Sequence, residues 1–344
     1  MRLLVTGGAG FIGSQFVRHW LTRHPDDAVV TLDLLTYAGL RSRLEEIGGD
    51  PRHRFVQGDI CEVSTVKRAM EGCEAVVHFA AETHVDRSIT NAAPFLRTNV
   101  EGTRVLLQAA MELGVRRFLH VSTDEVYGPI LEGSPTEDAR LNPRSPYAAS
   151  KAAGDLLVQA FWATYGLPTV VVRPTNVFGP SQFPEKFIPL SITNALRDAP
   201  LPIYGDGQQR RAWLFIEDLC RAIELIIQRG EVGSIYNVGS GSEFPNLEVA
   251  RAILRVLGKP ESLLRRVEDR PGHDRRYALD DRRLRALGWA PQVSFEDGLQ
   301  RTIEWYRGQP AWWQPLKDRL HDDPYHWLNR AAGASPGQTA RVER

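Results

Sequence analysis

In the first half of the chain, short apolar runs alternate with longer stretches that mix apolar and polar residues. Most of the runs are apolar on both sides, which is typical of strands in a parallel sheet covered by helices on both faces. They are Leu3–Thr6, Val29–Asp33, Arg54–Gln57, Ala75–Phe79, Arg117–Ser122 and Thr169–Arg173. The stretches between them are long enough for crossover helices at Phe11–Arg23, Ser64–Met70, Thr98–Leu113 and Pro146–Tyr165. The pattern predicts a doubly wound α/β fold of the Rossmann type, with ligands bound at the carboxyl ends of the strands.

The pattern changes after about residue 175. Prolines stand at positions 174, 180, 184, 189, 200 and 202, and we expect only short strands and helices from there on. We therefore expect a Rossmann-type domain at 1–175 and a smaller substrate domain at 176–320. The apolar run Ser234–Val238 is expected to return to the main sheet as an added strand. Residues 321–344 are polar and turn-rich, and we expect them to form a flexible tail.

Composition and charge narrow the possible partners. Lys plus Arg and Asp plus Glu both number 42, so no global charge draws the chain to nucleic acid or to an anionic membrane. The three cysteines form no CxxC pair and no zinc spacing, so we expect no metal and a reducing compartment, although one nucleophilic cysteine stays open. The start MRLLVTGGAG enters a strand at once, and we expect a cytoplasmic protein without signal peptide or membrane anchor.

A cluster of glycines follows the first predicted strand and opens the first predicted helix. Gly7, Gly10 and Gly13 fit a GxxGxxG pattern, and Gly8 gives the related GxGxxG. Alone, such a cluster is equally typical of a flexible turn. Asp33, however, closes the second strand twenty residues after Gly13, where an acid is suited to bind a ribose hydroxyl. Its carboxylate would repel a 2′-phosphate, so the sequence predicts an NAD site rather than an NADP site.

Two further motifs indicate proton chemistry. Tyr147 and Lys151 are four residues apart near a helix start, so we expect the ammonium beside the phenol, where it and ribose hydroxyls would favour the phenolate as a base. Thr123, Asp124 and Glu125 follow an apolar strand. An isolated acidic pair is more often a solvated turn, and a Tyr and Lys at this spacing are common on surfaces. Oxidation of an alcohol needs no pair of carboxylates, so an acid and a base together favour elimination of water next to a new carbonyl.

Nine motifs occur in the order seen in extended short-chain dehydrogenases, over about residues 1–315. They are GGAGFIG, TYAG, GDI, AAETHVDRS, STDEVYG, SPYAASK, FGPSQFPEKFIP, PLPIYGDGQQRR and RPGHDRRY. More narrowly, the chain resembles the dTDP-glucose 4,6-dehydratases. The resemblance implies that Tyr147 takes the C4 hydroxyl proton while hydride passes from C4 to NAD, and that Thr123 holds the C4 oxygen. Glu125 would then remove the C5 proton and Asp124 would protonate the departing C6 hydroxyl, before hydride returns to C6 and gives the 4-keto-6-deoxy sugar.

The resemblance also implies binding residues and a homodimer. The NAD site would comprise Gly7, Gly10, Phe11, Ile12, Gly13, Asp33, Asp59, Ile60, Ala80, Ala81, Tyr147 and Lys151. The nucleotide sugar would meet Thr83, His84, Arg87, Asn176, Lys186, Pro202, Tyr204, Arg211, Asn246, Arg270 and His273. Several of these residues have ordinary structural interpretations, such as surface ion pairs for the arginines near Asp269 and a satisfied core position for His84. The dimer would form through helices around Thr98–Leu113 and Tyr147–Tyr165.

The chain departs from the usual pattern of these dehydratases at four positions. Val177 and Phe178 replace Asn and Tyr, Ala212 follows Arg211, and Leu34 follows the strand-two acid where Lys or Asn is frequent. These changes leave open the base, thymine or uracil, and the sugar. A 4-epimerase or a glucuronate decarboxylase would also use Tyr147, Lys151 and NAD, but the acidic pair favours the dehydratase. A non-catalytic NAD-binding sensor is disfavoured because all of these groups are intact.

Overall fold

In the computed structural model, which describes residues 1–321, the core is a seven-stranded parallel sheet. The strand order is β10-β6-β5-β4-β1-β2-β3. The strands are β1 (Arg2–Thr6), β2 (Ala28–Asp33), β3 (His53–Gln57), β4 (Ala75–His78), β5 (Arg117–Val121), β6 (Thr169–Pro174) and β10 (Ile235–Val238). The predicted α/β fold with a parallel Rossmann-type sheet is confirmed. All but the first residue of the predicted tail 321–344 lies outside the described residues.

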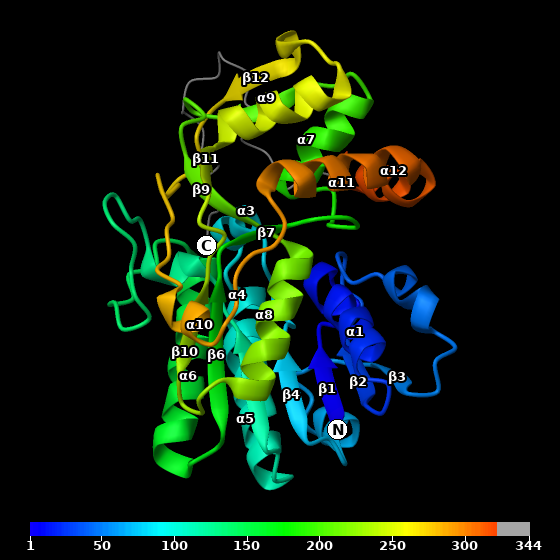
Figure 1. Ribbon diagram of the computed structural model, residues 1–344, viewed down its shortest axis with the longest axis vertical. Helices are drawn as coiled ribbons and strands as arrows, with labels where there is room; N and C mark the ends of the chain where they lie inside the picture. Colours follow the sequence, from blue (N-terminus) through cyan, green and yellow to red (C-terminus); the bar gives the residue numbers. More distant parts are fainter. Residues whose placement is uncertain (322–344) are drawn as a thin grey trace, which may run out of the picture.

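Two helical layers cover the sheet, because alternate residues of each strand face opposite sides (Figure 1). In β1, Leu3 and Val5 face one layer and Leu4 faces the other. The first layer contains α1 (Phe11–Arg23) and α8 (Ile216–Arg229), which pack against each other. The second contains α2 (Val63–Met70), α5 (Thr103–Glu112) and α6 (Pro146–Tyr165).

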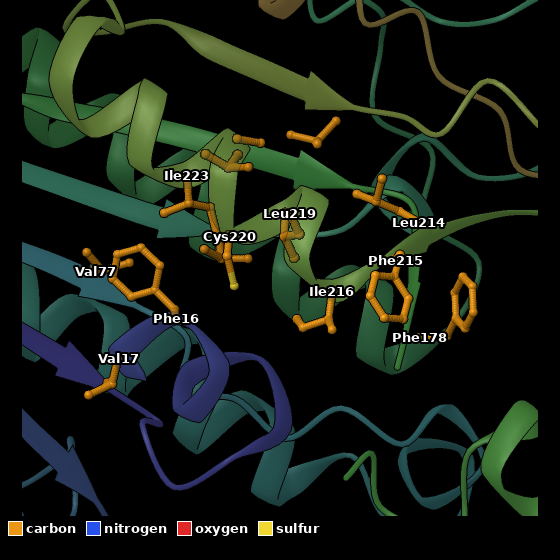
Figure 2. Packing of buried hydrophobic residues seen from close by; sticks show 14 of the residues in the cluster. Phe16, Val17, Val77, Phe178, Leu214, Phe215, Ile216, Leu219, Cys220 and Ile223 are labelled. Atoms are coloured by element: carbon orange, nitrogen blue, oxygen red, sulfur yellow. The ribbon is translucent and has the colours of Figure 1, made fainter. Parts of the chain in front are cut away.

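The core of the first layer extends beyond the main sheet. Figure 2 shows Phe16 of α1, Val77 of β4 and Cys220 of α8 in one apolar cluster. The same cluster continues to Phe178 and Phe215, which lie on strands outside the main sheet. Their ring centroids are 5.6 Å apart. One continuous core therefore joins the main sheet to the part of the chain that follows residue 175.

That part contains two small sheets. The order of one is β11-β9-β7, and the other pairs β12 with β8. Their strands are β7 (Asn176–Phe178), β8 (Leu201–Tyr204), β9 (Arg210–Phe215), β11 (Glu243–Pro245) and β12 (Leu264–Val267). The helices of this part outside the α1–α8 layer are α7 (Phe187–Leu196), α9 (Asn246–Leu257), α10 (Arg282–Ala286), α11 (Phe295–Gly308) and α12 (Pro310–Asp318). The remaining short helical segments of the described chain are η1 (Arg41–Ile47), α3 (Val85–Thr90), α4 (Ala93–Phe95), η2 (Leu96–Gly102), η3 (Asp124–Tyr127), η4 (Glu261–Leu263) and η5 (Arg319–His321).

The expectation of only short elements after residue 175 is wrong. Helices α8 and α11 have 14 residues each, and α9 has 12. The prolines interrupt only the segment up to residue 202, and beyond it apolar residues recur with helical spacing. The added strand β10 lies parallel to β6, with Ile235 opposite Val171. Within residues 1–321, no helix combines the length and the apolar character that a membrane crossing requires.

Candidate active site

A cavity of about 700 Å³ opens at the carboxyl ends of the main-sheet strands. Its walls include Gly7 after β1, Asp33 at the end of β2, Ala80 after β4, Ser122 after β5 and Pro174 at the end of β6. Parallel strands all end at the same edge, so segments far apart in sequence meet there. The cavity therefore lies where the strand pattern predicted ligand binding.

The glycine loop forms one wall of the cavity. Gly7 has φ +68°, a left-handed conformation that glycine adopts without strain, and its amide donates to the Leu32 carbonyl at 2.8 Å. A β-carbon on Gly13 would lie 2.3 Å from the Gly7 oxygen, so helix and loop pack too closely for a side chain. The positive end of the α1 helix dipole favours an anion such as a pyrophosphate at this position. No acidic residue in the first turn of α1 opposes this effect.

Asp33 is held at the second strand end by backbone hydrogen bonds. Its carboxylate accepts from the amide of Ala9 at 2.9 Å and from the amide of Leu35 at 2.8 Å. Burial raises the pKa of Asp33 above its ordinary value, and the amide hydrogen bonds oppose that shift. The side chain still lines the cavity, so an anionic acceptor stands where a ribose would lie beside the glycine loop. The residues present fit NAD.

All of the residues predicted for the cofactor line this one cavity. They are Gly7, Gly10, Phe11, Ile12, Gly13, Asp33, Asp59, Ile60, Ala80, Ala81, Tyr147 and Lys151. Thr123, Asp124 and Glu125 line it as well. Residues from the ends of five strands and from α6 therefore line the same cavity.

The acidic pair lies on the short helix η3, directly after β5. Thr123 caps this helix, because its hydroxyl accepts a hydrogen bond from the Glu125 amide at 3.2 Å. Burial, and secondly the charge of Glu125, raise the pKa of Asp124 to about 7. Burial also raises the pKa of Glu125. Two carboxylates in one buried site favour one shared proton, which suits one of them to act as an acid and the other as a base.

Tyr147 is the second residue of α6, and Ser145 caps this helix by accepting from the Ala148 amide at 3.1 Å. The phenol of Tyr147 lies close to Thr123, which opposes the rise in pKa that burial causes. Burial raises the pKa of Tyr147, and the nearby Glu125 raises it further. Lys151 donates from Nζ to the Val121 carbonyl at 2.7 Å, and burial lowers its pKa to about 8. This bond uses one of the three hydrogens of the ammonium, and both Lys151 and Tyr147 line the cavity.

The residues predicted for the nucleotide sugar fall into two groups. Thr83, Asn176 and Lys186 line the cavity, and the buried Oδ1 of Asn176 has no hydrogen-bond partner within residues 1–321. The structure does not place the others on the cavity wall: His84, Arg87, Pro202, Tyr204, Arg211, Asn246, Arg270 and His273. Lys186, Arg211 and Arg270 nevertheless lie near Glu125, because the charge of each lowers the pKa of that carboxyl. A cationic region thus adjoins the acidic pair.

Several of these side chains are already bound to neighbouring acidic residues. Arg270 and the Tyr204 hydroxyl both bind Asp86, at 3.0 Å and 3.1 Å. Arg87 donates to Glu185 at 3.3 Å and lies 3.9 Å from the centre of the Tyr37 ring. These contacts hold the charged groups in fixed positions beside the cavity.

Comparison with known proteins identifies the class of this site. Residues 3–239 match the model of the NAD dependent epimerase/dehydratase family. The chain belongs to this family. It is 52% identical to a dTDP-glucose 4,6-dehydratase of Streptomyces niveus, over 92% of this chain and 96% of that protein.

Solved structures agree with this assignment. DesIV, a dTDP-glucose 4,6-dehydratase of Streptomyces venezuelae solved with NAD bound, superposes with a TM-score of 0.90 at 53% identity, covering 92% of this chain and all of that one. A UDP-glucose 4-epimerase of Thermus thermophilus, also solved with NAD, superposes with a TM-score of 0.83 at 33% identity, covering 90% of this chain and all of that one. The chain is thus more similar in sequence to this dehydratase than to this epimerase.

Within this epimerase/dehydratase fold, the four departures fall in different places. Phe178 is fully buried, with its ring 5.5 Å from Phe295, and does not line the cavity. Ala212 is also buried away from it. Val177 and Leu34, in contrast, line the cavity. Only these last two changes alter the surface that a ligand meets there.

Two polar residues of the site were missed in the sequence. The buried guanidinium of Arg43 donates to the carbonyls of Ala9 at 3.0 Å, Ala38 at 2.7 Å and Ser181 at 2.9 Å, and thereby fixes three segments at the cavity wall. Tyr277 places its hydroxyl beside Glu125. Tyr277 stands in the quoted motif RPGHDRRY, which gave a signal for it, whereas no motif or periodicity marked Arg43.

Proposed function

We propose that the protein is a nucleotide-sugar 4,6-dehydratase that converts dTDP-glucose to its 4-keto-6-deoxy product with a retained NAD. The identity of about half of all residues to dehydratases over nearly the whole chain supports this activity. The observation that carries it is the acidic pair of Asp124 and Glu125 on the same cavity as Tyr147. An epimerase has no need of such a pair, whereas removal of water from C5 and C6 needs both a base and an acid.

Each of these side chains has a proposed task that its position suits. Tyr147 takes the proton of the C4 hydroxyl, and its neighbour Thr123 holds the C4 oxygen. Glu125 removes the C5 proton. Asp124, with a pKa of about 7, carries a proton in a large fraction of molecules near neutral pH and gives it to the departing C6 hydroxyl.

The cofactor site is proposed to hold NAD on the glycine loop, with the adenosine ribose at Asp33. NAD supplies the acceptor for the C4 hydrogen and returns that hydrogen to C6. Lys151 donates to Val121 and so fixes the junction of β5 with α6 on the cavity wall. Arg43 fastens the loop after β2 over the same wall, which favours retention of the cofactor.

The cationic region beside the acidic pair is proposed to hold the nucleotide diphosphate. Arg211, Arg270 and Lys186 would neutralise the phosphates, since guanidinium groups suit phosphate geometry. The side-chain amide of Asn246 can donate one further hydrogen bond from Nδ2 to a phosphate oxygen. Thr83, His84, Arg87 and Asn176 are assigned to the sugar, and Pro202, Tyr204 and His273 to the nucleotide.

We also propose that the protein forms a homodimer and that its chain has an NAD-binding part and a substrate-binding part. Leu96, Leu156, Trp162 and Tyr165 are exposed on η2 and α6, which pack side by side and offer an apolar surface for a second copy. Residues 1–175, together with α8 and β10, are proposed as the NAD-binding part, and the rest of 176–320 as the substrate part. We propose that the protein is located in the cytoplasm.

The activity is tested by incubating the purified protein with dTDP-glucose and, separately, with UDP-glucose. We expect a 4-keto sugar, detected by its absorbance in alkali, with a new C6 methyl signal in the proton NMR spectrum. Glu132→Gln, an exposed carboxyl outside the site, serves as the matched control for Glu125→Gln, which should make no product. A galactose product would instead establish a 4-epimerase, and turnover of UDP-glucose alone would change the assigned base.

A further inference from the structure

The hydroxyl of Tyr277 lies between two carboxylates, those of the half-buried Glu125 and the buried Asp274. It donates a hydrogen bond to Oδ2 of Asp274 at 2.9 Å and lies 3.4 Å from Oε2 of Glu125. The tyrosine residue is 3% exposed and Asp274 is 6% exposed. The phenol therefore bridges the proposed C5 base and a second acid that lies further from the cavity.

The position of the phenol is fixed by the backbone around it. The Tyr277 amide donates to the Arg210 carbonyl at 3.4 Å, and the guanidinium carbon of Arg211 lies 4.2 Å from the centre of the phenol ring. Arg211 also donates to the Asp274 carbonyl at 2.9 Å. Tyr277 and Asp274 are therefore both attached to β9, while Glu125 is held on η3.

A phenol has a single hydrogen, and this decides how the bridge works. While that hydrogen points to Asp274, the oxygen presents a lone pair to Glu125. An ionised Glu125 can only repel that lone pair, which fits the long distance of 3.4 Å. A protonated Glu125 can donate to it, so the chain of hydrogen bonds becomes complete once Glu125 has taken a proton.

We propose that Tyr277 relays the proton between Glu125 and Asp274 and so connects the C5 base to solvent. When Glu125 holds the C5 proton, this proton moves to the Tyr277 oxygen as the phenolic hydrogen moves to Asp274. One O–H bond breaks and one forms at the phenol, the negative charge passes from Asp274 to Glu125, and no electrons are gained or lost. The reverse transfer reloads Glu125 before C5 is protonated. The relay rests on the proposed function, because it serves a Glu125 that acts on C5.

The concerted transfer avoids a phenolate. Burial raises the pKa of Tyr277, and the neighbouring Glu125 raises it further, so a free phenolate is disfavoured at this position. A substrate that fills the cavity covers the face of Glu125 that lines it. The path through Tyr277 lies on the protein side of Glu125 and stays open during turnover. The proton returned to C5 is then exchanged with solvent rather than conserved.

The test is turnover in D₂O, with the deuterium at C5 of the product measured by NMR and mass spectrometry. The wild-type product should carry deuterium at C5. Tyr277→Phe should still form the product, yet its deuterium fraction at C5 should fall several-fold. Tyr236→Phe is the matched control, because it removes a buried phenol hydroxyl that accepts from the Glu231 amide, away from the cavity, and should exchange like the wild type.

Asp274→Asn removes the carboxylate that accepts the proton from Tyr277. It tests the proposed relay even if Tyr277→Phe does not fold. It should lower the deuterium fraction in the same direction. Equal deuterium in wild type and in a folded variant would overturn the relay, as would a wild-type product without deuterium at C5. Absence of any 4-keto-6-deoxy product from the wild type would refute the proposed function instead, so the two failures are distinguishable.

Discussion

The carbonyl oxygen of Gly7 lies 2.3 Å from the point that a β-carbon on Gly13 would occupy. The α-carbon of Gly8 would lie 2.8 Å from the same point, so backbone atoms and no flexible side chain would have to move. We predict that Gly13→Ala shifts this loop and weakens NAD binding by about tenfold or more, since such overpacking costs about 1–3 kcal/mol. Isothermal titration calorimetry with NAD measures the change.

Gly49→Ala is the control for this prediction. A β-carbon there meets no heavy atom within 4 Å, and the residue lies outside the cavity wall. Its NAD affinity should equal that of the wild type. Unchanged NAD binding in Gly13→Ala would mean that the glycine loop does not hold the cofactor.

The strand ends explain why so much of the site was predictable. Gly7, Asp33 and Asp124 each follow or end a buried strand of the main sheet. Because the carboxyl ends of parallel strands lie at the same edge of the sheet, these residues meet there although they are far apart in the sequence. The seven strands of the main sheet were predicted within one residue at each end, because most of them are buried on both faces and largely apolar, whereas the strands of the two small sheets were not predicted individually.

Contacts that depend on tertiary packing were not predictable. Tyr277 and Glu125 are separated by 152 positions, and no periodicity relates them. Lys151 shares a helix face with Tyr147, but its hydrogen bond to the Val121 carbonyl depends on how α6 packs against β5, which no spacing along the chain indicates. The length of the helices beyond residue 202 was not predicted, because the prolines at 174–202 interrupt only that segment and do not limit the helices that follow it.

The titration of the acidic pair predicts how activity depends on pH. Asp124 must carry a proton to act as the acid, and its pKa is raised to about 7. Above that pH the protonated fraction falls about tenfold per pH unit, so kcat/KM for dehydration should fall in the same way. A pH profile of product formation measures this limb. A rate that stays flat well above pH 7 would contradict the role of Asp124 as acid.

The same raised pKa also predicts that removing the Asp124 carboxyl stabilises the folded protein, although this carboxyl is needed for activity. A folded-state pKa of about 7 against an ordinary 3.8 means that ionised Asp124 is disfavoured in the fold. The cost is absent below pH 3.8, grows between the two values and is complete above pH 7. Asp124→Asn should therefore raise the free energy of unfolding at pH 8, by an amount on the order of a few kcal/mol. Urea unfolding at pH 8 and at pH 5 measures it, and a gain that does not shrink at pH 5 would exclude this cause.

The exposed Glu132 provides the control for both experiments on Asp124. Its side chain lies on the surface away from the cavity, so Glu132→Gln removes a carboxylate without removing a buried charge. Its activity profile and its unfolding free energy should follow the wild type at each pH. A stabilisation of Glu132→Gln equal to that of Asp124→Asn would point to net charge rather than burial.

A buried ion pair behind the active site leads to the last prediction. Arg173 donates from Nε to Oδ2 of Asp155 at 2.8 Å, and the two side chains are 1% and 0% exposed. Arg173 also donates to the hydroxyl of Tyr127 at 2.8 Å, which ties α6 to the helix that carries the acidic pair. Arg173→Met leaves the charge of Asp155 buried without its partner, and should lower the unfolding free energy by about 3–5 kcal/mol.

Removing the second charge as well should recover part of that loss. Asp155→Asn in the Arg173→Met background takes away the unpaired carboxylate, so the double variant should be more stable than Arg173→Met alone. Urea unfolding of the wild type, both single variants and the double variant gives the coupling free energy. Strict additivity of the two losses would show that the pair does not interact in the folded protein. Near-complete recovery of stability with little recovery of dehydration would instead show that Arg173 also positions the acidic helix through Tyr127, because Asn at position 155 cannot restore that hydrogen bond.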